Sequence, residues 1–475
     1  MLFNSLAFFA FIGIFYPVYF LLKGKARLWL CLVGSYFFYG YLDPRFLLII
    51  ITSTLIDYSI GLMLDKEVEE KRRKRLLTIS MVVNLGFLAI FKYFNFFVES
   101  FQDLVLSMGM TPSFNTFNII LPAGISFYTF QSMSYTIDVY YKKIPVEPDL
   151  ARFATFISFF PQLFAGPIVR AKEFLPQFKM DKKFDWNRFN SGVGQMLWGF
   201  FKKIVVADSL APFIDQCFAA PETFSSMHLM VGVIFYSFQI YCDFSGYSDI
   251  AIGLARTMGF DFPDNFKTPY FSKGFSEFWQ RWHITLSSWF RDYLYIPLGG
   301  SRNGTFNTYK NTMLTNLLSG LWHGASWVFV FWGFLHGIYI IIQRLIAPYF
   351  GKLMDAMQLP KMGRAGINIF LVYTATCFAW IFFRATDFNN ALEVISGIGK
   401  FENFTFGSIV NKFWFVKGVL VVGLLLLVEI TNVKFNFGQL VKKQPIFRAV
   451  SFATVMMLIA FFGTFGGNAF IYFVF

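Results

Sequence analysis

The chain has 475 residues, of which 56% are hydrophobic, 21% aromatic and only 15% charged. A soluble globular domain carries about 25% charged residues, so this composition excludes an ordinary soluble domain. The formal net charge of +13 does not indicate nucleic acid, because the basic residues concentrate in loops between apolar stretches, where membrane proteins carry their orientation signals. We therefore expect a protein that contacts membrane lipid and has no nucleic-acid partner.

Apolar runs of nearly membrane-spanning length recur along the whole chain. Examples are residues 49–62, 76–97, 120–140 and 416–428, and about eleven or twelve such runs approach the roughly 20 residues that cross a bilayer core. They lack the alternation of a membrane barrel, and helices satisfy their own backbone hydrogen bonds in hydrocarbon. The sequence predicts an all-α, polytopic transmembrane helical bundle. The first run, 6–22, lacks a basic start and a cleavage pattern, so we expect a retained helix rather than a signal peptide.

The charges of the loops predict the orientation of the chain in the membrane. Basic residues occur at 23–27, 71–75 and 142–143, whereas the connection 99–118 contains Glu99 and Asp103 and no Lys or Arg. Cytoplasmic loops carry an excess of Lys and Arg. We therefore expect the basic loops in the cytoplasm, and the 99–118 connection and the amino terminus outside.

No internal repeat, linker or low-complexity tract divides the chain, so we expect one membrane domain over residues 1–475. Residues 1–140 contain five spans, and residues 348–475 form the C-terminal spans. The middle zone, 141–347, holds most of the polar residues and is interrupted at Pro161, Gly166, Pro167, Pro297, Gly299 and Gly300. Irregular backbone at membrane depth requires surrounding protein or a water-filled cavity. We expect broken or re-entrant helices around a central tunnel there.

The sequence gives no signal for a metal centre or a disulfide framework. Cys31, Cys217, Cys242 and Cys377 lie scattered in or beside apolar segments, without the spacing of metal ligands or paired cysteines, and we expect them to be packing residues. No phosphate-binding glycine loop and no serine nucleophile motif is present. We therefore predict no bound metal and no covalent serine intermediate.

Histidine is the side chain best suited to proton transfer near neutral pH, and four histidines occur. His323 lies directly between two apolar stretches, and ionisable groups at membrane depth are costly and usually functional. A neutral histidine hydrogen-bonded between helices is the alternative. His336 follows His323 by thirteen residues, which on one unbroken helix means about 20 Å along the axis and 140° around it. The two could then not share a site. A break of the chain at 324–326 would relax this argument, but we expect His336 to be a structural or access residue, and His228 receives no role.

His283 lies in a stretch with helical periodicity. If residues 278–293 form one helix, Trp282, Leu286, Trp289, Phe290 and Tyr293 make an apolar stripe, and His283 lies beside it with Ser287 and Arg291. Such an amphipathic helix can present His283 to a cavity. It can equally lie at the surface with the histidine facing lipid headgroups.

Two carboxylates, Asp243 and Asp249, lie inside the apolar region 230–259. Unpaired carboxylates are expensive there, so we expect partners. The candidates are Arg281, Arg291, Lys267 or a histidine that a carboxylate would orient. A purely structural ion pair is the alternative.

Five ordered segments resemble the membrane-bound O-acyltransferase family, most closely its alginate O-acetylation branch with the peptidoglycan-acetylating and lipoteichoic-acid D-alanylating relatives. They are residues 121–131, 159–168, 243–249, 278–300 and 321–337. The resemblance implies that His323 is the catalytic residue and that His283 occupies the family's second position. It also implies a thioester donor, acetyl-CoA or another acyl thioester, with no tightly bound cofactor.

The resemblance further implies O-acetylation of an extracytoplasmic polysaccharide, such as an alginate-like exopolysaccharide or peptidoglycan. Transfer would occur at the bacterial cytoplasmic (inner) membrane, directly or through a periplasmic or surface acetyltransferase partner. Three alternatives remain open: D-alanyl transfer to teichoic acid, a polytopic transporter or flippase, and a non-catalytic scaffold. Five lysines either attract an anionic donor or only enforce orientation, namely Lys172, Lys202, Lys203, Lys267 and Lys273.

Overall fold

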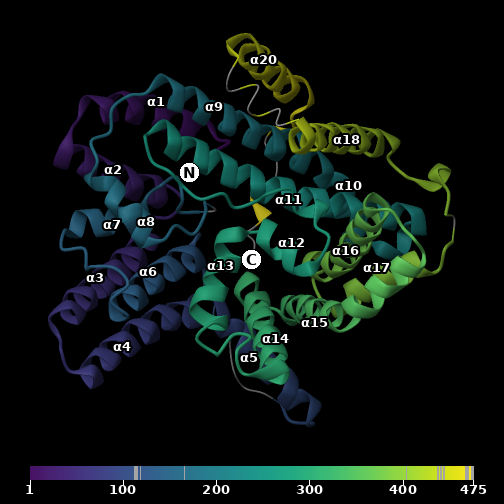
Figure 1. The fold of residues 1–475 in the computed structure, drawn as a ribbon, viewed down its shortest axis with the longest axis horizontal. Helices are drawn as coiled ribbons and strands as arrows, with labels where there is room; N and C mark the ends of the chain where they lie inside the picture. Colours follow the sequence, from purple (N-terminus) through teal and green to yellow (C-terminus); the bar gives the residue numbers. More distant parts are fainter. Residues whose placement is uncertain are drawn as a thin grey trace. The chain divides into compact units, whose positions relative to one another are not determined.

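A computed structural model provides the structure of the chain (Figure 1). It describes residues 1–111, 116–117, 119–164, 166–402, 404–435, 438, 441, 444–465 and 470–471. Over these residues the regular secondary structure is helical, without strands. The predicted all-α fold is therefore confirmed.

The described residues group into two compact units. Unit 1 comprises Met1–Val193 with Ala251–Pro263, and unit 2 comprises Gly194–Ile250 with Asp264–Phe475. Two long helices, α9 (Trp186–Phe200) and α11 (Ser226–Thr257), contribute residues to both units. The division into a single domain over 1–475 stays a prediction.

Unit 1 contains most of the N-terminal helices. They are α1 (Leu6–Leu21), α2 (Gly24–Gly40), α3 (Arg45–Lys66), α4 (Glu70–Leu88), the π-helical turn η1 (Ala89–Tyr93), α5 (Phe94–Ser107), α6 (Ile125–Tyr140), α7 (Leu150–Ser158), α8 (Ala171–Phe174) and the 3₁₀ turn η2 (Leu175–Lys179). Helices α3, α4 and α6 pack against one another around the buried Asp57 carboxylate. Asp57 accepts hydrogen bonds from Ser80 at 2.5 Å, from Asn84 at 2.7 Å and from Ser132. These donors satisfy a carboxylate that would otherwise be costly to bury.

Unit 2 contains the remaining helices and most of the predicted middle zone. They are η3 (Phe201–Ala207), α10 (Asp208–Ala219), η4 (Pro221–Thr223), η5 (Pro269–Phe271), α12 (Phe275–Arg281), α13 (Ile284–Phe290), η6 (Arg291–Tyr295), α14 (Gly304–His323), α15 (Trp327–Ala356), α16 (Lys361–Arg384), α17 (Phe388–Gly399), η7 (Phe406–Ser408), α18 (Lys412–Phe435) and α20 (Pro445–Phe462). Helices α14 and α15, both labelled in Figure 1, are consecutive in the chain and pack extensively against each other.

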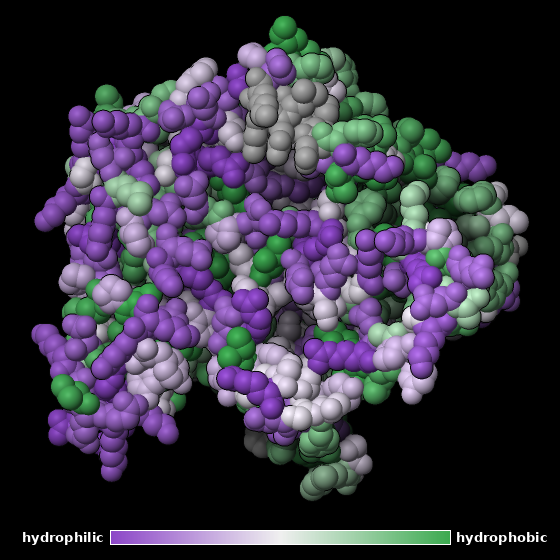
Figure 2. Space-filling model, viewed as in Figure 1, coloured by the Kyte–Doolittle hydropathy of each residue, from purple (hydrophilic) through white to green (hydrophobic). Residues whose placement is uncertain are grey.

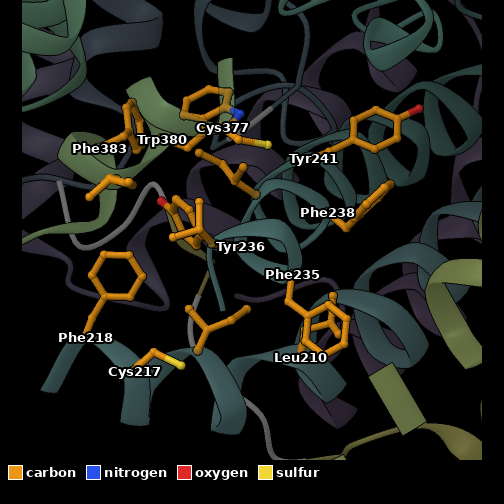
Figure 3. Close-up of a cluster of buried hydrophobic side chains, with 14 of the residues drawn as sticks. Leu210, Cys217, Phe218, Phe235, Tyr236, Phe238, Tyr241, Cys377, Trp380 and Phe383 are labelled. Carbon is orange, nitrogen blue, oxygen red and sulfur yellow. The ribbon is translucent and has the colours of Figure 1, made fainter. Parts of the chain in front are cut away.

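The core of unit 2 is rich in aromatic side chains from α10, α11 and α16. Figure 3 shows Phe218 of α10, Tyr236 of α11 and Trp380 of α16 gathered in this cluster, together with Cys217 and Cys377. Lipid tails are as apolar as these side chains, so close van der Waals packing holds such helices together. All four cysteines are buried and free of disulfides, which agrees with their predicted packing role.

Among the described residues, seven helices are long and apolar enough to cross a membrane. They are α3, the continuous helix Glu70–Ser107, α11, α15, α16, α18 and α20, and α1 is a shorter apolar helix. The predicted runs 49–62, 76–97 and 416–428 lie within three of the seven. On α18, large apolar side chains such as Phe413 and Leu420 are exposed, as expected of a lipid-facing helix. Figure 2 shows hydrophobic surface in the upper right of the view, where Figure 1 places α18. The larger count of eleven or twelve spans stays a prediction.

Candidate active site

Residues 278–293 do not form the one helix considered from the sequence. Helix α12 ends at Arg281, α13 begins at Ile284, and His283 between them has φ 42° and ψ 53°. Residues 265–267 cause the break. The Lys267 N–H donates to the Arg281 carbonyl and the Ile284 N–H donates to the Asn265 carbonyl, both at 2.9 Å. These bonds use backbone groups that a continuous helix would pair internally, and they hold His283 in the left-handed region, which is uncommon for residues other than glycine.

His323 is the last residue of α14, and the chain turns at 324–326 before α15 begins at Trp327. The break that the sequence left open is therefore present. The His323 side chain is buried, 1% exposed. Its ring centroid lies 5.0 Å from that of Trp332, 5.1 Å from Trp322 and 5.4 Å from Phe383. Aromatic walls thus surround the imidazole.

Two glycines bring α14 and α15 into the contact that positions His323. A Cβ atom on Gly320 would lie 2.2 Å from the Phe329 carbonyl oxygen, and one on Gly333 would lie 2.3 Å from the Asn316 carbonyl oxygen. Real Cβ atoms do not approach backbone this closely. Small residues at such crossings let membrane helices pack backbone to backbone.

His283 lies next to His323 within unit 2. The two ring centroids are 6.4 Å apart, and the His283 ring also contacts Trp322 at 5.9 Å and Phe244 at 4.5 Å. His283 is fully buried, so the alternative of a surface histidine facing headgroups is wrong. Burial lowers the pKa of the His283 imidazole. Burial thus favours the uncharged form of the ring. The structure brings the two predicted site residues together, and their catalytic roles stay a prediction.

Asn265 adjoins this pair and was not predicted from the sequence. Its Oδ1 lies 3.2 Å from His283 Nδ1, and its side chain is buried. The residue belongs to the connection between α11 and α12 and has no helical or strand periodicity around it. The sequence around Asn265 does not indicate a functional residue, because its partner His283 lies eighteen residues further along the chain. Only the folded structure brings the two side chains together.

The other two histidines occupy aromatic surroundings. His336 on α15 contacts Trp332 at 4.8 Å and Trp279 at 5.0 Å, so the chain break places His323 and His336 against the same indole ring. His228 is stacked on Phe213 at 4.3 Å and accepts a hydrogen bond from the Val410 N–H. These contacts give His228 a packing role.

Asp243 and Asp249 pair with two adjacent lysines of η3. Lys203 Nζ lies 2.6 Å from Asp243 and 2.8 Å from Asp208, while Lys202 pairs with Asp249 and donates to Ser245 Oγ at 3.0 Å. The partners predicted for Asp243 and Asp249 were therefore wrong. In the part of the chain that the structure describes, both carboxylates form ion pairs with lysines, which is the structural alternative. Those partners pair elsewhere, in Arg281–Glu277, Arg291–Asp292 and Lys267–Asp264. The periodicity of α11 could not reveal a partner on another helix.

The same geometry changes the interpretation of the five lysines. Lys202 and Lys203 are only 3% and 2% exposed, so neither is a surface charge that attracts a donor. Lys172, Lys267 and Lys273 are exposed. Within the described ranges, no three His, Cys, Asp or Glu side chains converge as metal ligands would.

Comparison with known proteins places this site in a family. The sequence profile of the membrane-bound O-acyltransferase family matches residues 36–384, which include His283 and His323. The probable alginate O-acetylase AlgI of Azotobacter vinelandii is 41% identical over 414 residues, covering 87% of this chain and 80% of that protein. The peptidoglycan O-acetyltransferase of Helicobacter pylori is 35% identical over 431 residues, covering 84% and 80%.

A more distant relative is named for the transfer of a different acyl group, D-alanyl. The teichoic acid D-alanyltransferase of Streptococcus thermophilus is 31% identical over 265 residues, which cover 52% of this chain and 63% of that protein. The profile match spans most of the chain, and two relatives above 30% identity are covered for four fifths of their length. The chain belongs to the membrane-bound O-acyltransferase family and is a multi-pass membrane acyltransferase.

Proposed function

We propose that this chain moves an acetyl group from a cytoplasmic thioester, acetyl-CoA or another acyl thioester, to hydroxyl groups of an extracytoplasmic polysaccharide. Transfer is direct or passes through a periplasmic or surface acetyltransferase partner, and the site of action is the bacterial cytoplasmic membrane. The similarity to O-acetylating relatives supports the acyl group and the acceptor class. The observation that carries the proposal is the buried His283–His323 pair within an aromatic enclosure.

In this proposal His323 is the general base. Its neutral imidazole takes the proton of the acceptor hydroxyl while the hydroxyl oxygen attacks the thioester carbonyl carbon. The new C–O ester bond forms and the C–S bond breaks. The imidazolium then returns its proton to the leaving thiolate, so the histidine ends each cycle in its starting form.

The surroundings of His323 support this role. Trp322, Trp332 and Phe383 line the imidazole with apolar surface. A site walled in this way limits water, which would otherwise hydrolyse the thioester. It also holds the reacting groups in one geometry, and such positioning contributes several kcal/mol to catalysis.

The test compares the intact chain, His323→Ala and a matched control in a strain lacking the gene. His228→Gln is the control, because His228 is a buried histidine whose contacts lie outside the site. Membrane levels of all three proteins are matched, and ester-linked acetyl is measured in each purified envelope polysaccharide. We expect restoration by the intact chain and by His228→Gln, and a loss of about 100-fold or more for His323→Ala.

Each other outcome contradicts part of the proposal. Equal acetylation with His323→Ala would exclude His323 as the base and would favour a scaffold. Ester-linked alanine in place of acetyl would favour D-alanyl transfer. Restoration of neither ester by the intact chain would favour transport.

A further inference from the structure

Asn265 makes more polar contacts around the histidine pair than its place in a loop would suggest. Its backbone carbonyl accepts from the Ile284 N–H at 2.9 Å. Its Oδ1 accepts from Thr285 Oγ1 at 2.9 Å and from the Thr285 N–H at 3.3 Å, and it faces His283 Nδ1 at 3.2 Å. Its Nδ2 donates to Ser248 Oγ at 3.1 Å. The side chain is 1% exposed, so water does not replace these contacts.

These contacts decide which atoms of the amide and the imidazole face each other. The Thr285 backbone N–H is always a donor, so the Asn265 atom that it meets must be the oxygen. That same oxygen faces His283 Nδ1. Two acceptors cannot share a hydrogen bond, so Nδ1 must carry the proton. In a neutral imidazole the lone pair then resides on Nε2.

We propose that Asn265 is a positioning residue that holds His283 as the Nδ1-protonated tautomer, with Nε2 as a hydrogen-bond acceptor, and fixes its ring beside His323. This inference rests on the proposed function and gives His283 a narrower role within it. In this form Nε2 cannot donate to a thioester carbonyl. It accepts from an O–H or N–H group, either the acceptor sugar hydroxyl or an amide of the donor's thioester arm.

The backbone gives Asn265 a second means of positioning. His283 has φ 42°, a conformation that residues other than glycine rarely adopt without support. The bonds from Asn265 to Ile284 and Thr285 lie on the two residues that follow His283. One side chain thus fixes the tautomer of the ring, while the same residue anchors the turn that directs the ring inward.

The tautomer can be measured without an activity assay. The full chain is labelled with ¹⁵N at its histidine side chains, and ring nitrogen shifts are recorded at neutral pH. Because the chain has four histidines, the signal missing in His283→Gln identifies His283. We expect a protonated Nδ1 and an unprotonated Nε2 in the intact chain. We expect the opposite tautomer or a mixture in Asn265→Ala. A protonated Nε2 in the intact chain would overturn the proposal.

Acetylation in the deletion strain supplies the functional arm, with four variants at matched membrane levels. Asn265→Ala removes the oxygen, and we expect acetylation to fall about 10- to 100-fold, the size of effect that follows loss of a partner that orients a metal-ligating histidine. Asn265→Asp keeps an oxygen facing Thr285 and His283 and should retain activity within a few-fold. Asn390→Ala is the matched control, since Asn390 also donates from a side chain to its surroundings, at the Phe218 carbonyl, and should leave acetylation unchanged. His283→Ala is the fourth variant.

The outcomes separate this inference from the proposed function. If His283→Ala acetylates normally, His283 has no part in the reaction. The proposed role of Asn265 in positioning His283 then fails as well. If His283→Ala is inactive while Asn265→Ala is normal, the proposed site stands and the positioning role falls. If Asn265→Asp is as inactive as Asn265→Ala although both are folded, the acceptor oxygen is not what matters and the inference is wrong.

Discussion

At the scale of single residues, one buried lysine of unit 2 lies between two buried carboxylates. Lys203 contacts both Asp208 and Asp243, and all three side chains are at most 4% exposed. The sequence indicated that Asp243 needed a partner but assigned the wrong ones. An ion pair on the same helix has a recognisable spacing, whereas a pair between α11 and η3 depends on how the helices pack.

Replacing Lys203 should therefore destabilise the protein strongly. Lys203→Met leaves two buried carboxylates without their cation, and removing one member of a buried pair costs about 3–5 kcal/mol. Thermal unfolding in detergent, followed by gel filtration with fluorescence detection, should show a clearly lower Tm or loss of folded protein. Lys267→Met is the control, because its pair with Asp264 is exposed and such pairs contribute about 0–1 kcal/mol. An unchanged Tm for Lys203→Met would show that the cluster is not what holds α11 against η3.

At the scale of helices, two chain breaks position the site, and the sequence left one of them open. Residues 324–326, directly after His323, include Gly324 and Ser326, and glycine and serine are residues that interrupt helices locally. The break at Trp282–His283 had no such signal. It results from backbone hydrogen bonds to residues 265–267, a contact that helical periodicity cannot reveal. The local pattern thus favoured a single amphipathic helix that the fold divides.

The crossing of α14 and α15 gives a prediction at this scale. Gly333→Ala would place a Cβ 2.3 Å from the Asn316 carbonyl oxygen, so the two helices must separate. Overpacking of this kind costs about 1–3 kcal/mol, and the shift would move His323 at the end of α14. We expect a lower Tm in detergent and acetylation reduced at least several-fold. Gly351→Ala, on the same helix α15, meets no atom within 4 Å and should change neither quantity. Equal behaviour of the two variants would contradict the close crossing.

At the scale of the whole chain, composition and apolar runs were sufficient for the all-α membrane fold, and motif resemblance was sufficient for the family. His323 and His283 could be selected from the sequence because few ionisable groups lie near apolar sequence there. Asn265 and the lysine partners could not, because asparagine and lysine are common in loops and only tertiary packing gives these particular residues their contacts. The sequence does not show which residues become neighbours when the helices pack, and the contacts of Asn265 and Lys203 depend on that packing.

The orientation of the chain in the membrane is the remaining prediction at this scale. The continuous helix Glu70–Ser107 has 38 residues and is thus about 57 Å long, longer than the roughly 30 Å hydrocarbon core. Its two ends should therefore emerge on opposite sides. The basic start of α4 predicts a cytoplasmic beginning, and the acidic residues of α5 predict an outer end.

Cysteine labelling can test this orientation directly, because the four natural cysteines are buried and should react little with a membrane-impermeant maleimide. Val68 precedes the helix and is 91% exposed, while Met108 follows it and is 63% exposed. We expect Met108→Cys to be labelled in intact spheroplasts and Val68→Cys only after the membrane is opened. The reverse labelling pattern would mean that the chain has the opposite orientation. The basic loops would then lie outside, against the rule that cytoplasmic loops carry an excess of Lys and Arg. Labelling of both sites before opening would mean that this helix does not cross the membrane.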